Sequence, residues 1–185
     1  EYFVYAAAPM SVDKLKEAID VFGPVMTQSY GQAEAPMICT YLSPEAHIEA
    51  LETNKAHRLA SCGQPSLLTP VEIMDDDENL LPIGERGEIV VRGSLVMAGY
   101  FKNKAATDEV STSNGWHRTG DIGVKDEDGF IYIVDRKKDM IISGGFNIYP
   151  SEIEQVVWGH DAVQDCAVIG VPDDKWGEAV KAIVE

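Results

Sequence analysis

A helix pattern between two strand patterns is the feature that most constrains the fold of this chain. Residues 2–5 are typical of a strand, and Ser11 can cap the helix that follows. This helix ends before Gly23-Pro24, and its single apolar stripe consists of Val12, Leu15, Ala18, Ile19 and Phe22. Residues 25–30 predict a second strand, followed by a polar turn at residues 31–34. This order is typical of α/β proteins, which bind ligands beyond the ends of their strands.

From about residue 66 the pattern changes to short strands and turns. Two acidic runs, at residues 75–78 and 126–128, lie between strand patterns. Neither run has the alternating ligand spacing of a calcium loop, so we expect exposed turns there. The strands of this β-rich region are expected at residues 70–74, 87–93 and 129–134.

From about residue 136 a third pattern combines short strands with one helix. Strands are expected at residues 140–142 and 167–171, and a last strand pattern runs to Glu185. Ser151 and Glu154 have the spacing of a capping box, which predicts that the helix begins directly after Pro150. The buried side of this helix is expected to contain Ile153, Val156 and Val157.

Charge and composition exclude several classes of function. The 185 residues carry a net charge of −16, whereas general nucleic-acid binders have clustered Lys and Arg. The 3 cysteines are too few and too far apart for a disulfide framework, which favours a reducing, cytoplasmic location. The 4 histidines show no His-x-x-x-His pattern, which argues against zinc. No apolar run reaches the roughly 20 residues of a membrane span, and no signal peptide opens the chain.

Both ends of the sequence look cut. A strand pattern begins at Tyr2, and another is still running at Glu185. Natural domains more often end in polar, loosely held residues. We therefore expect a fragment of a longer protein.

Residues 116–154 combine polar groups, a charged joint and a glycine turn, which a core-building segment does not require. Asp121 offers carboxylate acceptors for vicinal ribose hydroxyls, or else it holds a turn. Arg136 can reach a phosphate or ribose oxygen, or it belongs to a charged solvated linker. Ser143-Gly144-Gly145 leaves room for something narrow to pass, or forms an ordinary turn.

The turn at residues 31–34 is a second candidate binding segment. Gly31 permits a close backbone approach, and Glu34 can hold Mg²⁺ through a carboxylate oxygen. The alternative is a plain turn with a solvated Glu34. The chain contains neither Gly-x-x-x-x-Gly-Lys-Ser/Thr nor Gly-x-Gly-x-x-Gly, which removes the two commonest nucleotide-binding folds.

The order of these motifs resembles that of the adenylate-forming (AMP-binding) superfamily, and within it the acyl-CoA synthetases. The likeness covers essentially the whole chain. Within the superfamily the chain is most similar to bacterial acyl-CoA synthetases of fatty or aromatic acids. The motifs that carry the likeness are Ala6-Ala7-Ala8-Pro9, Tyr30-Gly31-Gln32-Ala33-Glu34, Gly84-Glu85-Arg86-Gly87-Glu88-Ile89, Gly99-Tyr100 and residues 116–154.

The resemblance implies an AMP-forming acid–thiol ligase. A small carboxylic acid would react with ATP, in the presence of Mg²⁺, to give acyl-AMP and pyrophosphate, and CoA would then displace AMP. It also implies three parts. These are the end of an N-terminal α/β subdomain at residues 1–65, a β-rich, distorted-barrel subdomain at 66–135, and the start of a mobile α+β C-terminal domain at 136–185. A homo-oligomer is left open.

The resemblance also implies roles for single residues in nucleotide binding. Glu34 would bind Mg²⁺, Asp121 would bind the ribose hydroxyls, and Arg136 would reach the ribose or phosphate edge. Tyr30 would stack near the adenine. Further nucleotide-binding positions would be Ala6, Ala7 and Ala8, together with Pro9, and Gly31, Gln32 and Ala33.

Four further residues match the moving part of such enzymes. Lys138 corresponds to the hinge about which the C-terminal domain swings between the two half-reactions. Ser143, Gly144 and Gly145 would border the channel for the pantetheine arm of CoA. Adenylation must exclude water and thiolation must then admit a thiol, which a mobile domain allows.

The chain departs from the superfamily in two ways. Ala33 stands where a Thr hydroxyl usually contacts the phosphate, and the loss of such a bond costs about 1.5–3 kcal/mol. The phosphate loop is expected before residue 1 and the catalytic lysine after Glu185, so we expect no catalytic residue in this chain and no adenylation by it alone.

Two alternatives to the acyl-CoA synthetase remain at this stage. The first keeps the chemistry and changes the acceptor, as in an acyl-carrier-protein ligase or a peptide-synthetase adenylation domain. The second, motivated by Ala33, is a degenerate nucleotide-binding or interaction module.

Overall fold

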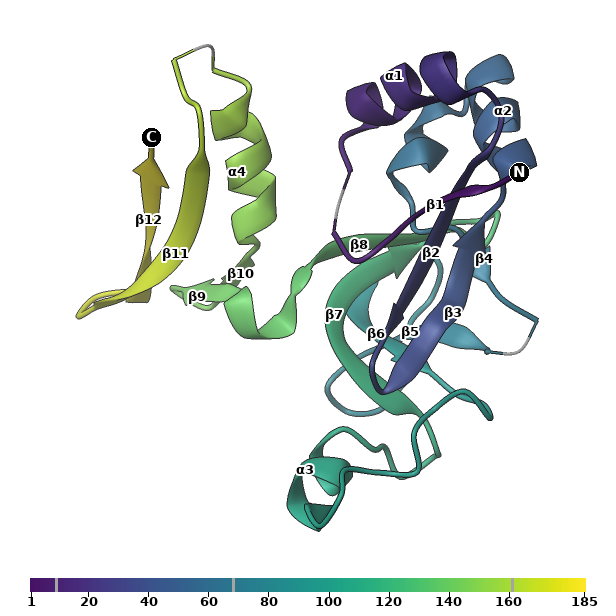
Figure 1. Ribbon diagram of the computed structural model, residues 1–185. Coiled ribbons are helices and arrows are strands. Elements are labelled where there is room, and N and C mark those ends of the chain that lie inside the picture. The colour runs from purple at the N-terminus through teal and green to yellow at the C-terminus, as the bar shows by residue number, and fades with distance from the viewer. Residues whose placement is uncertain (9, 68, 161) are drawn as a thin grey trace. The chain divides into compact units, whose positions relative to one another are not determined.

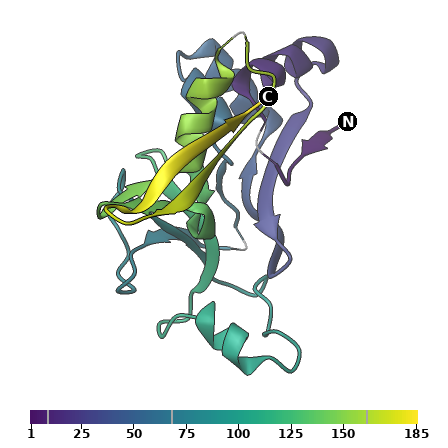
Figure 2. The ribbon, with the colours of Figure 1, turned by 90° about the vertical axis from the view of Figure 1, so that its left-hand side faces the viewer.

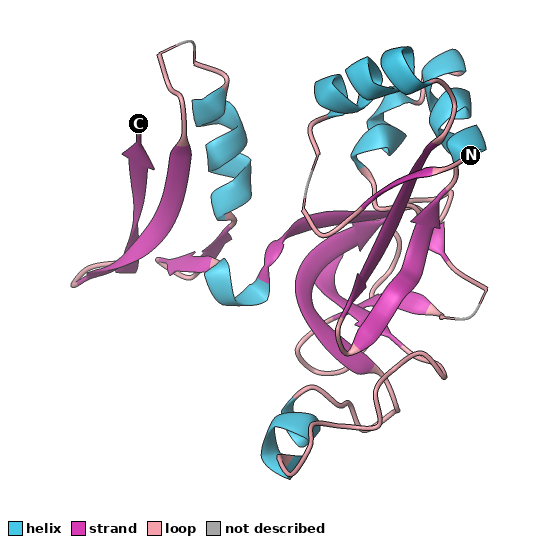
Figure 3. Ribbon diagram, viewed as in Figure 1, coloured by secondary structure: helices cyan, strands magenta, loops and turns pink. Residues whose placement is uncertain are grey.

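The computed structural model describes residues 1–8, 10–67, 69–160 and 162–185, and Figure 1 shows the order of their elements. These residues divide into two compact units. The first unit comprises residues 1–119 and 123–133, and the second comprises residues 120–122 and 134–185. The expected mixture of α/β and α+β structure is confirmed (Figure 3). The boundaries expected near residues 65 and 135 stay predictions.

The first sheet contains the strand–helix–strand unit that the sequence predicts. Strands β1 and β2 pair in parallel because helix α1 (Val12–Phe22) connects them, whereas β2 and β3 form an antiparallel hairpin. Gln32 still pairs with Ala35, so the turn expected at residues 31–34 is confined to Ala33 and Glu34. In their order across the sheet, the strands are β1 (Phe3–Tyr5), β2 (Met26–Gln32), β3 (Ala35–Leu42) and β4 (Gln64–Pro65).

Helix α1 follows its sequence pattern closely. The Ser11 hydroxyl accepts a hydrogen bond from the Lys14 amide, and Leu15 and Ile19 are buried. Phe22 is 54% exposed and stacks on Phe3, with 5.1 Å between ring centroids, so it is not a core residue of the stripe. Helix α2 (Pro44–Glu52) and the 3₁₀ turn η1 (Ala56–Ala60) have no counterpart among the elements expected from the sequence.

The second sheet contains the strands of the β-rich region. Both acidic runs form the expected turns: Asp75 accepts a bond from the Asn79 amide, and Asp126 accepts one from the Phe130 amide. The described strands form an open order of four, too few to close a barrel, so the expected distorted barrel is wrong. The elements are β5 (Val71–Met74), β6 (Arg86–Val91), α3 (Lys104–Glu109), β7 (His117–Lys125) and β8 (Ile131–Arg136).

Two larger buried clusters and a small one of Met74, Val90 and Trp116 stabilise the first unit. One fills the space between the two sheets, and a second packs α1, α2 and η1 against β2. Each fully buried aliphatic side chain contributes about 1.5–3 kcal/mol by leaving water. The cluster between the sheets contains Tyr30, Ala35, Cys39, Cys62, Val71, Ile73, Ile89, Val91 and Ile131.

The second unit is a four-stranded sheet with one helix. Helix α4 (Pro150–Trp158) lies along β11 (Figures 1 and 2), and Ile153 and Val157 pack on a small core of Ile141, Cys166 and Val168. The short turn η2 (Lys137–Asp139) precedes the sheet. In their order across the sheet, the strands are β10 (Phe146–Ile148), β9 (Ile141–Ser143), β12 (Gly177–Val184) and β11 (Cys166–Asp173).

Two expectations for α4 are wrong. The helix begins at Pro150, and Ser151 already lies inside it, so Ser151 and Glu154 do not form a capping box. Instead the Ser151 amide donates to Asp135 Oδ2 at 2.9 Å, and the Ser151 hydroxyl donates to the Val134 carbonyl. Glu154 accepts a bond from the Val168 amide of β11. Val156 is 77% exposed rather than buried, because the helix rests on the sheet through Ile153 and Val157.

Candidate functional site

The three residues Ala6, Ala7 and Ala8, here called the alanine loop, follow directly after β1. Ala7 has a φ of 72°, a left-handed conformation that costs an L-residue roughly 1–2 kcal/mol, so neighbouring contacts must hold it. Tyr5, the last residue of β1, lies with its hydroxyl 2.9 Å from His47 Nε2, and His47 Nδ1 lies 2.7 Å from the Ser43 carbonyl. Burial raises the pKa of Tyr5 and lowers the pKa of His47. Ala6 and Ala8 are exposed, and Pro9 lies outside the described residues.

Tyr30 and Gly31 fix the position of the C-terminal end of β2 through their packing. Tyr30 is buried in the cluster between the sheets. A Cβ atom on Gly31 would lie 2.6 Å from the Met37 amide nitrogen, so only glycine allows β2 and β3 to approach here. The hairpin ladder is irregular between Tyr30 and Gln32, and Met37 has a φ of 62°.

The turn after β2 presents two polar side chains. Glu34 Oε1 accepts a hydrogen bond from the Tyr100 hydroxyl at 2.7 Å, and the Glu34 carbonyl accepts one from the Met97 amide at 2.7 Å. Gln32 Nε2 lies 2.8 Å from His117 Nε2. Ala33 is exposed in the turn between them and offers no hydroxyl.

His117 is a buried neighbour of this turn that the sequence reasoning missed. It is 4% exposed, and burial lowers its pKa, partly opposed by the carboxylates of Glu34 and Glu88. With Met97 it lines a hollow of about 130 Å³. A single histidine in a strand pattern gives no sequence signal for this contact, because its partner Gln32 lies 85 residues away.

In the second unit, Asp121 and Arg136, both expected to contact a nucleotide, form an ion pair with each other. Arg136 Nη1 donates to Asp121 Oδ1 at 2.8 Å. The Asp121 side chain is 9% exposed, and the Arg136 side chain is 54% exposed. A charge-assisted bond of this kind fixes the orientation of the carboxylate, while the arginine remains accessible to an anion.

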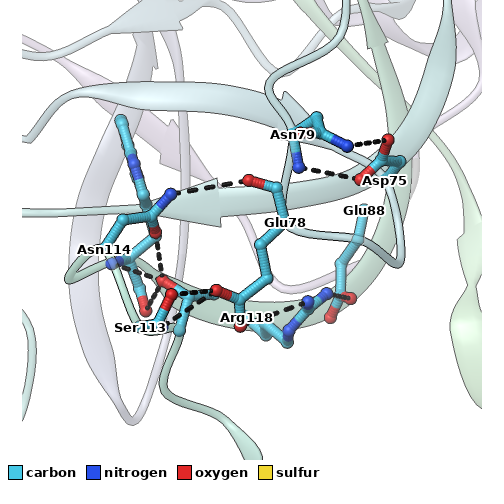
Figure 4. Close-up of polar contacts among 9 residues, drawn as sticks. Asp75, Glu78, Asn79, Glu88, Ser113, Asn114 and Arg118 are labelled. Atoms are coloured by element: carbon cyan, nitrogen blue, oxygen red, sulfur yellow. Dashed lines mark hydrogen bonds and ion pairs between the residues drawn. The ribbon is translucent and has the colours of Figure 1, made fainter.

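Arg118, in the first unit, is less exposed than Arg136 and contacts two acidic residues (Figure 4). Its Nη1 donates to Glu88 Oε2 at 2.9 Å, and its Nη2 lies 4.0 Å from Glu78 Oε1. Glu78 Oε2 in turn accepts a bond from the Ser113 amide at 3.0 Å. The Arg118 contacts therefore join β6, β7 and the acidic turn between β5 and β6. The sequence offered no signal for this network.

The hinge and channel candidates lie on short elements of the second unit. Lys138 is exposed in η2. Gly144 and Gly145 form the turn between β9 and β10, both with positive φ, and Ser143 begins it. The Gly144 amide donates to the Trp176 carbonyl at 2.8 Å, and a Cβ on Gly144 would lie 2.7 Å from the Trp176 ring. Trp176 is 50% exposed beside this turn.

The donor chemistry of these residues fits the groups that the resemblance implies. Among the described residues, no three His, Cys, Asp or Glu side chains gather to form a metal cage. A single carboxylate such as Glu34 suits Mg²⁺, which usually keeps waters and phosphate oxygens as its other ligands. The Asp121 carboxylate suits vicinal hydroxyls, which are donors. No helix within the described ranges is long and apolar enough to cross a membrane.

Comparison with known proteins gives consistent matches. The model for "AMP-binding enzyme" matches residues 1–101, and that for "AMP-binding enzyme C-terminal domain" matches residues 152–185. The medium/long-chain-fatty-acid–CoA ligase FadD8 of Mycobacterium tuberculosis is 47% identical over 100% of this chain and 31% of its own length. The chain thus spans about a third of the length of such relatives.

Two solved structures are similar over nearly all of the chain. The amide bond synthetase McbA of Marinactinospora thermotolerans has a TM-score of 0.85 at 38% identity, over 99% of this chain and 35% of that one. The O-succinylbenzoate coenzyme A synthetase MenE of Bacillus subtilis, in complex with ATP and magnesium ion, has a TM-score of 0.82 at 36% identity. That match covers 100% of this chain and 36% of that one.

Proposed function

This chain belongs to the AMP-binding enzyme family, and we propose that it forms the nucleotide-gripping part of an AMP-forming acyl-CoA ligase. The observation that carries the proposal is the Asp121–Arg136 pair, because it holds a buried carboxylate in one orientation. A carboxylate fixed in this way can accept bonds from two adjacent ribose hydroxyls. The name of the similar fatty-acid–CoA ligase supports the same reaction class.

The proposed reaction has two steps. A carboxylate oxygen of the acid attacks the α-phosphorus of ATP, and the bond to pyrophosphate breaks, giving acyl-AMP. The sulfur of CoA then attacks the acyl carbon, and AMP leaves. In the first step Glu34 would hold Mg²⁺, which neutralises phosphate charge when bound. Glu34 is pre-oriented for this by the Tyr100 hydroxyl.

The remaining residues are proposed to serve binding and motion. Tyr30, Gly31, Gln32 and Ala33, with the alanine loop, would shape the nucleotide pocket. Lys138 would be the hinge, and Ser143, Gly144 and Gly145 would border the path of CoA. The cysteines Cys39, Cys62 and Cys166 are free thiols, which supports the proposed reducing, cytoplasmic location.

A segment exchange tests the proposed activity. The matching segment of the M. tuberculosis ligase is replaced by this chain, which aligns with it from end to end. We expect the hybrid to form acyl-CoA and pyrophosphate from a fatty acid, ATP and CoA. Asp121→Asn should lower the rate about 10- to 100-fold, because a charge-assisted bond to the nucleotide is lost.

The matched control is Asp20→Asn, an exposed carboxylate on α1, which should leave the rate unchanged. A hybrid that folds but forms neither acyl-AMP nor acyl-CoA, before and after Ala33→Thr, would favour the degenerate binding module instead. Equal rates for Asp121→Asn and the unaltered hybrid would remove Asp121 from the site.

A second candidate function differs in the molecule that accepts the acyl group from acyl-AMP. The similar protein McbA is an amide bond synthetase, which makes an amine acceptor a rival to CoA. The hybrid should therefore be given CoA, a phosphopantetheinylated carrier protein and an amine in separate reactions. Product with CoA alone supports the acyl-CoA ligase, and product with either other acceptor assigns the corresponding rival.

A further inference from the structure

A side-chain contact between Gln32 and His117 joins the turn that carries Glu34 to β7. Gln32 Nε2 lies 2.8 Å from His117 Nε2, and both residues belong to the first unit. An amide nitrogen carries only donors, so His117 Nε2 accepts this bond and is unprotonated. His117 is 4% exposed, so water cannot readily replace the bond.

The other contacts of the turn come from the segment before α3. The Met97 amide donates to the Glu34 carbonyl at 2.7 Å, and the Tyr100 hydroxyl donates to Glu34 Oε1 at 2.7 Å. Met97 and His117 line the same hollow, so the support from β7 and the support from this segment are adjacent. Glu34 is thus held through its own carboxylate, through its carbonyl and through its neighbour Gln32.

Burial, and not the surrounding charges, favours a neutral, accepting imidazole at His117. The carboxylates of Glu34, from the turn, and Glu88, from β6, face it and favour its protonation. Glu88 is at the same time paired with Arg118, whose Nη1 lies 2.9 Å away. Burial opposes protonation and is the largest influence on the His117 pKa.

We propose that His117 is a positioning residue for the metal-binding carboxylate: through Gln32 it fixes the β2–β3 turn, and so the place of Glu34. This inference rests on the proposed role of Glu34. Loss of the imidazole leaves the part-buried Gln32 amide without that acceptor, and the turn relaxes around Ala33. His117 touches no substrate in this scheme and acts only through Gln32.

Amide hydrogen exchange in the 185-residue chain tests the positioning without any ligand. The Met97 amide reports on the turn, because it donates to the Glu34 carbonyl. The Leu81 amide, which donates to the Ile73 carbonyl at 2.8 Å, is the internal reference for the stability of the whole unit. In His117→Phe we expect Met97 to exchange about 10-fold faster relative to Leu81, the factor that one lost hydrogen bond produces.

Four further variants, one of them a control, separate positioning from ordinary core packing. Gln32→Leu should speed Met97 exchange like His117→Phe, and the double variant should add little, since both remove one contact. His117→Gln, which restores a carbonyl acceptor, should recover part of the protection. The matched control is His47→Phe, which removes an equally buried imidazole from Tyr5 and should leave the Met97-to-Leu81 ratio unchanged. An unchanged ratio in His117→Phe overturns the proposal.

A metal titration then separates this inference from the proposed function. Mn²⁺, a paramagnetic substitute for Mg²⁺, should broaden the amide signals of Ala33 and Glu34 in the presence of ATP. Broadening that survives Glu34→Gln overturns the metal role of Glu34, whatever the exchange data show. A second outcome overturns the positioning role alone. In it, Glu34→Gln abolishes the broadening, but His117→Phe requires no more Mn²⁺ than the unaltered chain. We expect His117→Phe to require several-fold more Mn²⁺.

Discussion

Two arginine–carboxylate pairs have nearly equal N–O distances but differ in exposure to solvent, one in each unit. Arg118 and Glu88 are 2.9 Å apart in the first unit, with side chains only 16% and 5% exposed. Arg136 and Asp121 are 2.8 Å apart in the second, but the Arg136 side chain is 54% exposed. The first pair is enclosed by protein and joins strands. The second leaves its arginine accessible, so it can exchange a protein contact for a ligand.

The hydrophobic core is also more extensive in the first unit than in the second. In the first unit, sheets and helices are joined through buried clusters that include Leu15, Met26, Ile73 and Ile89. In the second, the buried cluster consists of Ile141, Cys166 and Val168. Hydrogen bonds at the ends of elements, such as Asp135 with Ser151, therefore carry more of the organisation of the second unit. Substitutions should consequently affect stability more at the Arg118–Glu88 pair and ligand binding more at the Arg136–Asp121 pair.

The largest expected effect is that of Arg118→Met. It leaves Glu88 buried without its cation, which costs about 3–5 kcal/mol of unfolding free energy. Urea denaturation of the 185-residue chain measures this loss. The matched control is Lys104→Met, which breaks the exposed pair with Asp108 and should cost well under 1 kcal/mol.

Pairing the substitution with Glu88→Leu sharpens the same prediction. The double variant removes both charges and should regain most of the lost stability, because a buried pair is often replaceable by apolar groups. A double variant as unstable as Arg118→Met would mean that lost packing, not the missing cation beside Glu88, causes the effect.

A smaller effect is expected at the start of α4. Asp135→Ala removes the acceptor for the Ser151 amide and should cost about 1 kcal/mol, the usual value of a helix cap. Exchange of the first α4 amides should accelerate while those of the first unit stay as they are. Ser151→Ala, which keeps the bond from the Ser151 amide to Asp135, should leave amide exchange at the helix start slow; acceleration there would assign the cap to the hydroxyl.

Arg136→Met is expected to cost less stability still. Its guanidinium is half exposed, so the pair with Asp121 should contribute no more than about 1 kcal/mol to folding. AMP binding, measured by calorimetry on the segment-exchange hybrid, should weaken about 10-fold through loss of a charged contact. A stability loss as large as that of Arg118→Met would remove the contrast between the two pairs.

The smallest effect is a drift of stability with pH in the first unit. Burial lowers the pKa of His47 and His117 below the ordinary value of 6.5, so the unfolded chain takes up protons first. Stability should be complete above pH 6.5 and decline as the pH falls below it. Thermal unfolding between pH 7 and 5 measures the decline. His47→Phe combined with His117→Phe should flatten it, and an unchanged slope would assign it to other groups.

The two main helices show how far local sequence patterns reach. The Ser11 cap and the apolar stripe of α1, apart from the exposed Phe22, were predicted correctly, because capping and amphipathic spacing act within a few residues. The Ser151–Glu154 pattern of α4 is equally good as a sequence, yet Asp135 binds the Ser151 amide instead. That competitor lies 16 residues upstream, outside the range of any capping rule.

The candidate site likewise contains residues that local sequence patterns identify and residues that only distant contacts reveal. Its motifs, with Glu34, Asp121 and Arg136, could be named from residue type and order, whereas the ion pair between Asp121 and Arg136 was not predicted. His117 and Tyr100 could not be recognised, because their partners Gln32 and Glu34 lie 85 and 66 residues away. The outcome at Val156 was also out of reach, since either neighbouring face of α4 could have met the sheet.

The sequence by itself determined the family motifs, the first helix with its cap and the acidic turns, because these depend on neighbouring residues and on residue chemistry. Only the tertiary structure decided which arginine is enclosed and which is exposed, what holds the turn of Glu34, and that the second sheet stays open. These outcomes depend on strand register, which sets which side chains meet across a sheet once distant segments have packed.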